Sequence, residues 1–237
     1  MNKYLFLFTI GPVQSFIAQA RKTQDLYAGS FLLSHLIDIG IDTLKKNKVE
    51  YESVFPTENI KSTPNRFIAK IGAESSEKIE AVGRYVEAAV RSEFKNIAAE
   101  CVQEKLAVGT DFDEQIKTHL QVYWVALPLD GSTYSDTYSA LERYLGAIKN
   151  VRNFQQLEET GRKCSLCGER NVLLYRRTDE ERNGLKKRRD GLLRKLYVKR
   201  EEVAFFEPED ESDELKLQKG EGLCAVCFAK RFADNYF

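Results

Sequence analysis

The sequence predicts an α+β fold in two parts, and three observations support this prediction. Apolar segments typical of strands alternate with segments of helical periodicity over residues 1–150. Four of the five cysteines form two Cys-x-x-Cys pairs, and strongly charged runs appear after Gly161. We therefore expect an α+β domain over residues 1–150 and a small, helix-rich Cys₄ module with a charged insertion over residues 151–237.

The composition is that of a folded protein without charge bias. Hydrophobic residues make up 43% of the 237 residues and charged residues 30%, which argues against a disordered chain. The 36 Lys and Arg residues balance 36 Asp and Glu residues, so the overall charge does not favour wrapping nucleic acid or docking on an acidic membrane. The apolar segment 3–10 is too short to span a bilayer and precedes no cleavage site, so we expect a cytoplasmic protein with no membrane partner.

The chain begins with a predicted strand that leads into a two-part helix. Residues 3–10 are β-branched and aromatic enough for a buried strand, which Gly11-Pro12 ends. An apolar stripe of helical spacing starts at Val13. We expect a break in this helix over residues 25–30, after which a second stripe continues towards Leu44.

The remaining elements of the first domain are a hairpin, two helices and a strand. Short strands are predicted at 51–55 and 66–71. Ser75-Ser76 can cap a long amphipathic helix that ends near Gly109, and a short helix follows. Residues 122–129 are apolar on both faces and therefore predict a central strand.

The resulting order is strand, helix, strand, strand, helix, strand. This is the split βαβ arrangement of a ferredoxin-like domain, with a four-stranded antiparallel sheet and helices on one face. A further helix around residues 138–148 is expected to lead out of this domain towards Phe154.

The two cysteine pairs predict a structural zinc site. Cys164 with Cys167 and Cys224 with Cys227 can complete a tetrahedral shell around one ion, and Gly168 suits the tight turn of the first pair. Four sulfur ligands leave no open position, so the metal is expected to be structural. The alternatives are four buried thiols without metal, or a redox pair. We disfavour the redox pair because neither pair is expected to follow a strand at a helix start.

Other chemistry-bearing residues indicate structural roles. Cys101 is expected to act as a small buried hydrophobe, and His35 and His119 as helix-face residues. The basic run 186–200 is expected to be a solvated face, and the acidic run 207–214 a solvated loop. No Walker loop, Gly-x-Ser-x-Gly motif, His-Asp or adjacent Asp-Asp occurs, so we assign no catalytic residue.

The segment "IGPVQSFIAQARKTQDLYAGSFLLS", residues 10–34, resembles the N-terminal segment of the large subunit of type III CRISPR effector complexes, specifically the Cmr type (III-B). Members of that family contain two ferredoxin-like palm domains and a zinc-binding Cys₄ module near the first. The resemblance implies that this chain is the first palm with its zinc module. It would form the non-catalytic half of a cyclic-oligoadenylate synthase and a docking platform within an RNA-guided antiviral complex, with the other subunits, crRNA and target RNA as partners.

Two elements of that family are not found in this sequence. The palm begins at residue 3 without a preceding HD nuclease domain, and the Gly-Gly-Asp-Asp hairpin of the second palm is missing. We therefore expect a fragment or the product of a split gene, truncated at the C-terminus. It should not be catalytic alone and should meet ATP and Mg²⁺ only together with a second palm.

The resemblance also suggests nucleotide-facing residues. Because ATP binds between the two palms in the family, Gly11, Pro12, Gln14 and Ser15 are candidates to face a nucleotide at the start of the first helix. The alternative is that Gly-Pro only ends the strand. Similarly, the residues of the predicted break can position a loop beside the same cleft, or they can simply end one helix and cap the next with Ser30; these residues are Asp25, Tyr27, Gly29 and Ser30.

Two other functions compete with this interpretation. The palm fold can serve purely as an interaction scaffold without nucleotide contact. Alternatively, the chain is a free-standing zinc-containing protein that binds nucleic acid through residues 186–200, although the neutral overall charge and the nearby acidic run count against this.

Overall fold

The computed structural model describes residues 2–57, 60, 62–102, 110–131, 133–151, 161–182, 203–208 and 211–237. The chain divides into two compact units. The first unit comprises Met1–Phe16, Ser30–Phe94 and Leu120–Gln155. The second comprises Ile17–Gly29, Lys95–His119 and Gln156–Phe237, so it includes two segments that precede residue 151.

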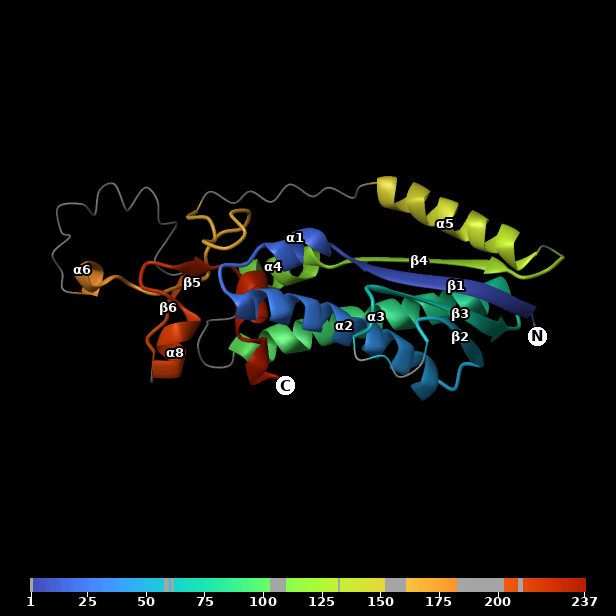
Figure 1. Ribbon diagram of the computed structural model, residues 1–237, viewed down its shortest axis with the longest axis horizontal. Coiled ribbons are helices and arrows are strands. Elements are labelled where there is room, and N and C mark those ends of the chain that lie inside the picture. Colours follow the sequence, from blue (N-terminus) through green and yellow to red (C-terminus); the bar gives the residue numbers. More distant parts are fainter. Residues whose placement is uncertain are drawn as a thin grey trace. The chain divides into compact units, whose positions relative to one another are not determined.

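The first unit contains a four-stranded antiparallel sheet (Figure 1). Its strands lie in the order β2-β3-β1-β4, and every neighbouring pair is antiparallel. The predicted hairpin is confirmed as β2 and β3. The prediction of a central last strand was wrong, because among the described strands β4 pairs with β1 alone and forms an edge of this sheet. The bounds are β1 (Asn2–Gly11), β2 (Tyr51–Phe55), β3 (Arg66–Ala73) and β4 (Gln121–Pro128).

The crossover from β1 to β2 consists of α1 (Gln14–Ala18) and α2 (Thr23–Lys46). The two-part helix is confirmed, but its predicted break over residues 25–30 was wrong. The chain bends before α2, where the Asp25 carboxylate accepts hydrogen bonds from the backbone N–H groups of Arg21 (2.9 Å) and Lys22 (3.1 Å). Ser30 lies inside α2 and caps no helix.

One face of the sheet packs against α2 and α3 (Ser76–Val102). Phe67 stacks with Phe8 at 5.3 Å between ring centroids, and its ring also approaches the α-carbon of Gly40 in α2. Trp124 packs against the backbone of Gly83 in α3. These contacts place the large aromatic side chains of the sheet beneath the two helices.

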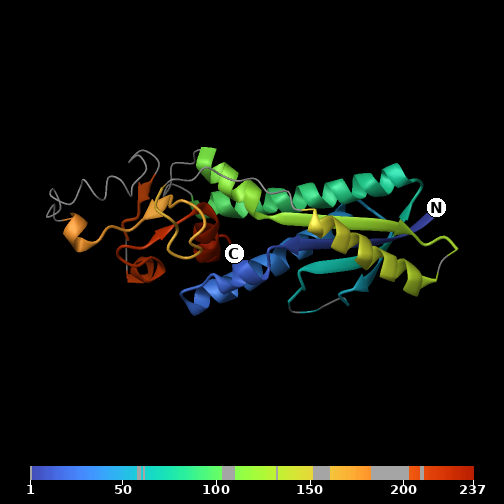
Figure 2. The ribbon, with the colours of Figure 1, turned by 90° about the horizontal axis from the view of Figure 1, so that it is seen from above.

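The other face is covered by α5 (Tyr134–Asn150), as Figure 2 shows. Leu141 and Leu145 of α5 form one buried cluster with Leu5, Leu7 and Val125 of the sheet. The expectations that helices cover only one face and that this helix leads out of the domain were therefore wrong. Because β1 and β4 are covered on both sides, residues 122–129 are apolar on both faces even though β4 is an edge strand.

A small three-stranded sheet, ordered β6-β5-β7, lies in the second unit. Its strands are β5 (Leu174–Tyr175), β6 (Ala204–Phe205) and β7 (Gly222–Leu223). Among the described residues, the helices that lie wholly in this unit are α4 (Thr110–His119), α6 (Asp179–Arg182), α8 (Glu211–Lys216), α9 (Ala225–Arg231) and a 3₁₀ turn (Ala233–Asn235). Among the described residues, no helix is both long and apolar enough to cross a membrane.

The acidic run is not simply the solvated loop expected from its charge. Its second half forms the start of α8, and the carbonyl groups at the end of α8 are bound by cations. Lys22 donates to the Leu215 carbonyl, and Arg231 donates to the Lys216 carbonyl at 2.9 Å. Positive side chains at a helix C-terminus complement the helix dipole, which explains why so acidic a segment can be helical.

Candidate metal centre

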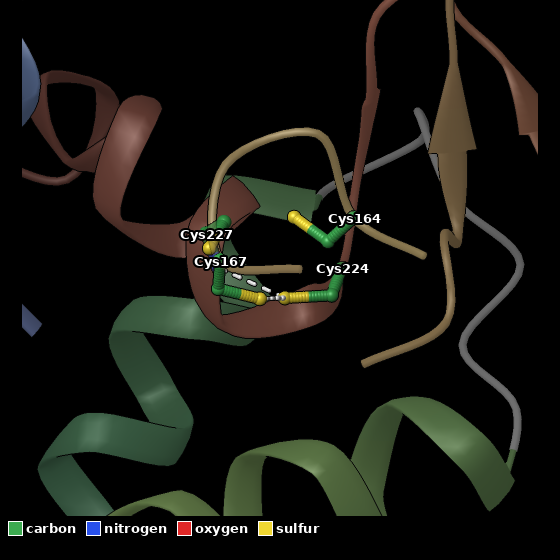
Figure 3. Close-up of side chains that lie close together, drawn as sticks. All are labelled: Cys164, Cys167, Cys224 and Cys227. Atoms are coloured by element: carbon green, nitrogen blue, oxygen red, sulfur yellow. Dashed lines mark hydrogen bonds between the residues drawn. The ribbon is translucent and has the colours of Figure 1, made fainter. Parts of the chain in front are cut away.

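Four cysteine side chains meet in the second unit (Figure 3). The sulfur atoms of Cys164, Cys167, Cys224 and Cys227 all lie within 4.8 Å of one another. Three of these residues are buried, and Cys167 is half-buried. The structure thus brings together all four residues that the sequence proposed as metal ligands.

The first pair lies in a tight turn stabilised by backbone hydrogen bonds. Gly168 has a φ of 69°, a left-handed conformation that glycine adopts without strain. Its N–H donates to the Cys164 carbonyl at 2.9 Å, and the Leu166 N–H points at the Cys164 sulfur at 3.4 Å. Donation of N–H groups to a sulfur favours its negatively charged form, which is the form that binds metal.

The second pair begins a helix. Cys224 is the N-cap of α9, and its sulfur accepts from the Cys227 N–H at 3.5 Å. Since β7 ends at Leu223, this pair does follow a strand at a helix start, so the stated reason for disfavouring a redox role was wrong. The convergence of four sulfurs, rather than two, is the observation that favours a metal site.

The four cysteines fit a tetrahedral metal ion with sulfur ligands. In such a site, metal–sulfur bonds of about 2.3 Å place neighbouring sulfurs about 3.8 Å apart. The sulfurs of Cys167 and Cys224 lie 3.8 Å apart. Burial raises the pKa of the Cys224 thiol, so a bound cation is what would make the thiolate form stable there.

A helix far from the cysteines in sequence supports both pairs. The Gln115 side chain of α4 is 1% exposed. Its oxygen accepts from the Ala225 N–H at 2.9 Å, and its nitrogen donates to the Asn171 carbonyl at 3.1 Å. Sequence reasoning missed this residue. The available signal was a polar side chain on the apolar stripe that Phe112 and Ile116 define.

The two histidines lie on helix faces, as predicted. His35 of α2 approaches Glu93 of α3 at 2.7 Å. His119, the last residue of α4, is buried, and its Nδ1 lies 3.4 Å from the Arg170 guanidinium. Burial, with a smaller contribution from Arg170, lowers the pKa of His119 to about 3, so its imidazole is neutral.

Cys101 also behaves as predicted. Its sulfur lies 3.2 Å from the Phe232 carbonyl, and burial raises the pKa of its thiol to about 12. It therefore remains a protonated, buried side chain outside the four-cysteine cluster.

A segment near the N-terminus, Ile17–Gly29, belongs to the second unit, and a buried ion pair connects it to α9. We call it the N-terminal segment. Arg231 donates to Asp25 from Nε and Nη2, and to Glu221 from Nη1 at 3.1 Å. Burial alone would raise the pKa of Asp25, but the hydrogen bonds and charge of Arg231, together with the backbone N–H groups of Arg21 and Lys22, hold this pKa below its ordinary value. The neighbouring Lys230 donates to the Gln19 carbonyl at 2.5 Å. Two residues at the end of α9 therefore bind both ends of the α1–α2 connection: Lys230 binds Gln19, just after α1, and Arg231 binds Asp25, in the first turn of α2.

The residues proposed to face a nucleotide lie at the surface of the first unit. Gly11 is the last residue of β1, where it pairs with Gln121, and a cis peptide bond joins it to Pro12. Gln14 and Ser15 are exposed on α1. Among the residues of the predicted break, Tyr27 and Ser30 are exposed, and Asp25 and Gly29 are buried. The basic run 186–200 lies outside the described residues.

Comparison with known proteins gives a consistent result. Residues 5–60 match the family described as "CRISPR-associated protein Cmr2, N-terminal". A curated relative, the CRISPR system Cmr subunit Cmr2 of Pyrococcus furiosus, is 26% identical over 271 residues, which cover 96% of this chain and 30% of the relative.

Two solved structures of type III-B Cmr-β complexes share the fold. The apo state matches with a TM-score of 0.62 at 16% identity, over 99% of this chain and 32% of that one. The state bound to cognate target RNA matches with a TM-score of 0.55 over the same shares. The chain thus spans about a third of the length of these relatives. The comparisons confirm the resemblance inferred from residues 10–34: this chain is similar to the N-terminal part of the Cmr2 subunit of CRISPR Cmr systems, and it shares the fold of the matched chains in type III-B Cmr-β structures.

Proposed function

We propose that this chain is the first palm and zinc module of a Cmr-type large subunit. In this role it forms the non-catalytic half of a cyclic-oligoadenylate synthase and a docking platform within an RNA-guided antiviral complex. The observation that carries the proposal is the match of residues 5–60 to the Cmr2 N-terminal family, because this segment contains most of β1 and the α1–α2 connection.

The strand order supports a ferredoxin-like palm. β3 lies between β1 and β2, and β1 lies between β3 and β4, so two β-α-β units interleave. A helical crossover joins the two strands of each unit. This is the split arrangement that defines ferredoxin-like domains.

The metal in the Cys₄ cluster is proposed to be zinc in a structural role. Four sulfur ligands at tetrahedral spacing are typical of structural zinc and leave no coordination position for a substrate. The ion would supply folding free energy to the second unit, whose strands among the described residues are only two residues long.

The nucleotide would be shared with a second palm and would contact the start of α1. Gln14 and Ser15 are exposed there, next to the end of β1, and are therefore accessible to a nucleotide held by another domain. Because the first palm offers no Gly-Gly-Asp-Asp hairpin, Mg²⁺ and the catalytic carboxylates would come from that second palm. Other subunits, crRNA and target RNA are the proposed partners, in line with the complexes that contain the structural relatives.

Reconstitution tests this function. The purified chain is mixed with the second-palm part of a Cmr-type large subunit and the remaining subunits, and cyclic oligoadenylate is measured with ATP, Mg²⁺ and target RNA. We expect product only from the mixture and none from either part alone. Association without any effect on product would favour the scaffold interpretation, whereas metal-dependent turnover by this chain alone would contradict the proposal.

A further inference from the structure

The two cysteine pairs come from chain segments that must be held in register. Cys167 and Cys224 are 57 residues apart in sequence, yet their sulfurs belong to the same cluster. On one side the two segments bond directly, because the Ser165 N–H donates to the Gly222 carbonyl at 2.8 Å and the Gly222 N–H donates to the Ser165 hydroxyl at 3.0 Å. A second connection runs through a side chain from elsewhere in the chain.

That side chain is Gln115. Its single amide group bonds to the segment that follows the first pair, at Asn171, and to the segment that contains the second pair, at Ala225. Ala225 is the first residue of α9 and lies between the two cysteines of that pair. Its N–H has no partner within the helix, so the Gln115 oxygen fixes the N-terminus of α9 at a defined distance from the first pair.

We propose that Gln115 is a positioning residue of the metal centre: its amide sets the separation of the two cysteine pairs, and metal affinity depends on it. This inference rests on the proposed metal site. An amide is suited to the task because it carries a donor and an acceptor on one rigid group, and the two backbone partners here require one of each. Since the side chain is 1% exposed, water is poorly placed to replace either bond.

Two substitutions separate the parts of this role. Gln115→Met keeps the length and volume of the side chain but removes the hydrogen bonds to Asn171 and Ala225. Gln115→Glu keeps the acceptor for Ala225 but turns an oxygen towards the Asn171 carbonyl, which removes the second bond. Lys117→Met is the matched control, because its side chain lies on the same helix and is 78% exposed.

The measurement is Zn²⁺ affinity by competition with a chelator, together with the absorption spectrum of the Co²⁺-substituted full chain. We expect Gln115→Met and Gln115→Glu each to bind Zn²⁺ about 10- to 100-fold more weakly than the parent, with altered Co²⁺ bands, as for other groups that orient metal ligands. Lys117→Met should match the parent in both respects.

The outcomes distinguish this inference from the metal site itself. If the parent chain binds no metal, the proposed zinc site fails. If the parent binds Zn²⁺ and both Gln115 variants bind it as tightly as the parent, the positioning role is overturned. This holds even if the variants melt at lower temperatures than the parent both with and without metal, because such a loss of stability would show only a structural role. Should Gln115→Met not fold, Gln115→Glu alone decides, because it retains one of the two bonds.

Discussion

Arg231 and Asp25 form a buried pair: Nη2 of Arg231 donates to Oδ2 of Asp25 at 2.8 Å, and both side chains are 0% exposed although 206 residues separate them. The pair joins the first turn of α2 to the last turn of the helix that begins at the metal cluster. The N-terminal segment therefore has a structural task of its own, which is to complete the second unit.

Asp25→Asn should destabilise the second unit strongly. Removing one partner of a buried ion pair leaves an uncompensated charge and costs about 3–5 kcal/mol; we expect about 3 kcal/mol because Glu221 still faces Arg231. Asp42→Asn, which breaks the exposed pair of Asp42 with Lys45 on the same helix, should cost at most about 1 kcal/mol. Denaturant unfolding of the metal-loaded chains, followed by far-UV circular dichroism, measures both. Equal costs for the two variants would contradict this prediction.

The loss of unfolding free energy caused by Asp25→Asn should not depend on pH near neutrality. Burial would raise the pKa of Asp25, but Arg231 and the backbone N–H groups of Arg21 and Lys22 together hold it below its ordinary value. A carboxylate with a depressed pKa stabilises the fold fully above the ordinary value of about 3.9 and loses this contribution only as the pH falls through the lower, folded-state pKa. The free-energy difference between parent and variant should thus be constant from about pH 9 down to about pH 5.5. A difference that shrinks steadily across that interval would show that the carboxylate titrates there.

The strands and most helices could be predicted from sequence because their periodicity and punctuation are local. Gly11-Pro12 ends β1, and the spacing of apolar residues in α3 is helical from Ile79 to Cys101. The position of β4 could not be predicted, because an apolar pattern on both faces reports that both faces are covered and does not report how many strand neighbours exist. Similarly, α5 has the pattern of any amphipathic helix, and only the packing of Leu141 shows what it covers.

The metal cluster was predictable because Cys-x-x-Cys spacing encodes local ligand geometry. The side chains that support the cluster from elsewhere in the chain could not be predicted. The partners of Gln115 and of Arg231 are far away in sequence, and a buried polar residue on an apolar stripe indicates only that some partner exists. The start of α2 was misplaced for the same reason, since Asp25 was interpreted as a helix breaker before its partner was known.

Removal of the metal should unfold the second unit and spare the first. Cys227→Ser, or chelation, removes a ligand or the ion that supplies folding free energy there. We expect fast hydrogen exchange at Ala225 and also at Arg21 and Lys22, whose N–H groups bind Asp25 within the same unit. Fluorescence of Trp124, the single tryptophan, should stay that of the folded first unit.

The control for this experiment is Cys101→Ser, which changes a buried cysteine outside the cluster. It should leave one metal ion per chain in place. Metal-free chains in which residues 21 and 22 exchange as slowly as in the loaded chain would refute the coupling between the ion and the N-terminal segment.

Two helix glycines should respond in opposite directions to alanine. A Cβ on Gly83 of α3 would lie 2.6 Å from the Trp124 ring, so Gly83→Ala should destabilise the first unit by about 1–3 kcal/mol. A Cβ on Gly146 of α5 would meet no atom within 4 Å, so Gly146→Ala should stabilise it by about 0.5–1 kcal/mol through helix propensity. Denaturant unfolding followed by Trp124 fluorescence measures both. Shifts in the same direction would mean that the space around one of these glycines differs from that described.

A negative charge at the start of α1 should separate the nucleotide-facing interpretation from the scaffold interpretation. Ser15 is the second residue of α1 and is exposed, so Ser15→Asp should leave the fold intact, because a carboxylate suits the positive end of a helix dipole. If a nucleotide phosphate lies there, however, the same charge repels it, and we expect weaker ATP binding and less cyclic oligoadenylate in the complex assembled with a second palm.

Ser135→Asp is the matched control, because Ser135 is the exposed second residue of α5. ATP affinity is measured by equilibrium binding and product by chromatography. A loss confined to Ser15→Asp supports nucleotide contact at Gly11–Ser15. Unchanged binding and product in both variants would mean that Gly11 and Pro12 only end a strand, and that this unit contributes to the complex as a scaffold.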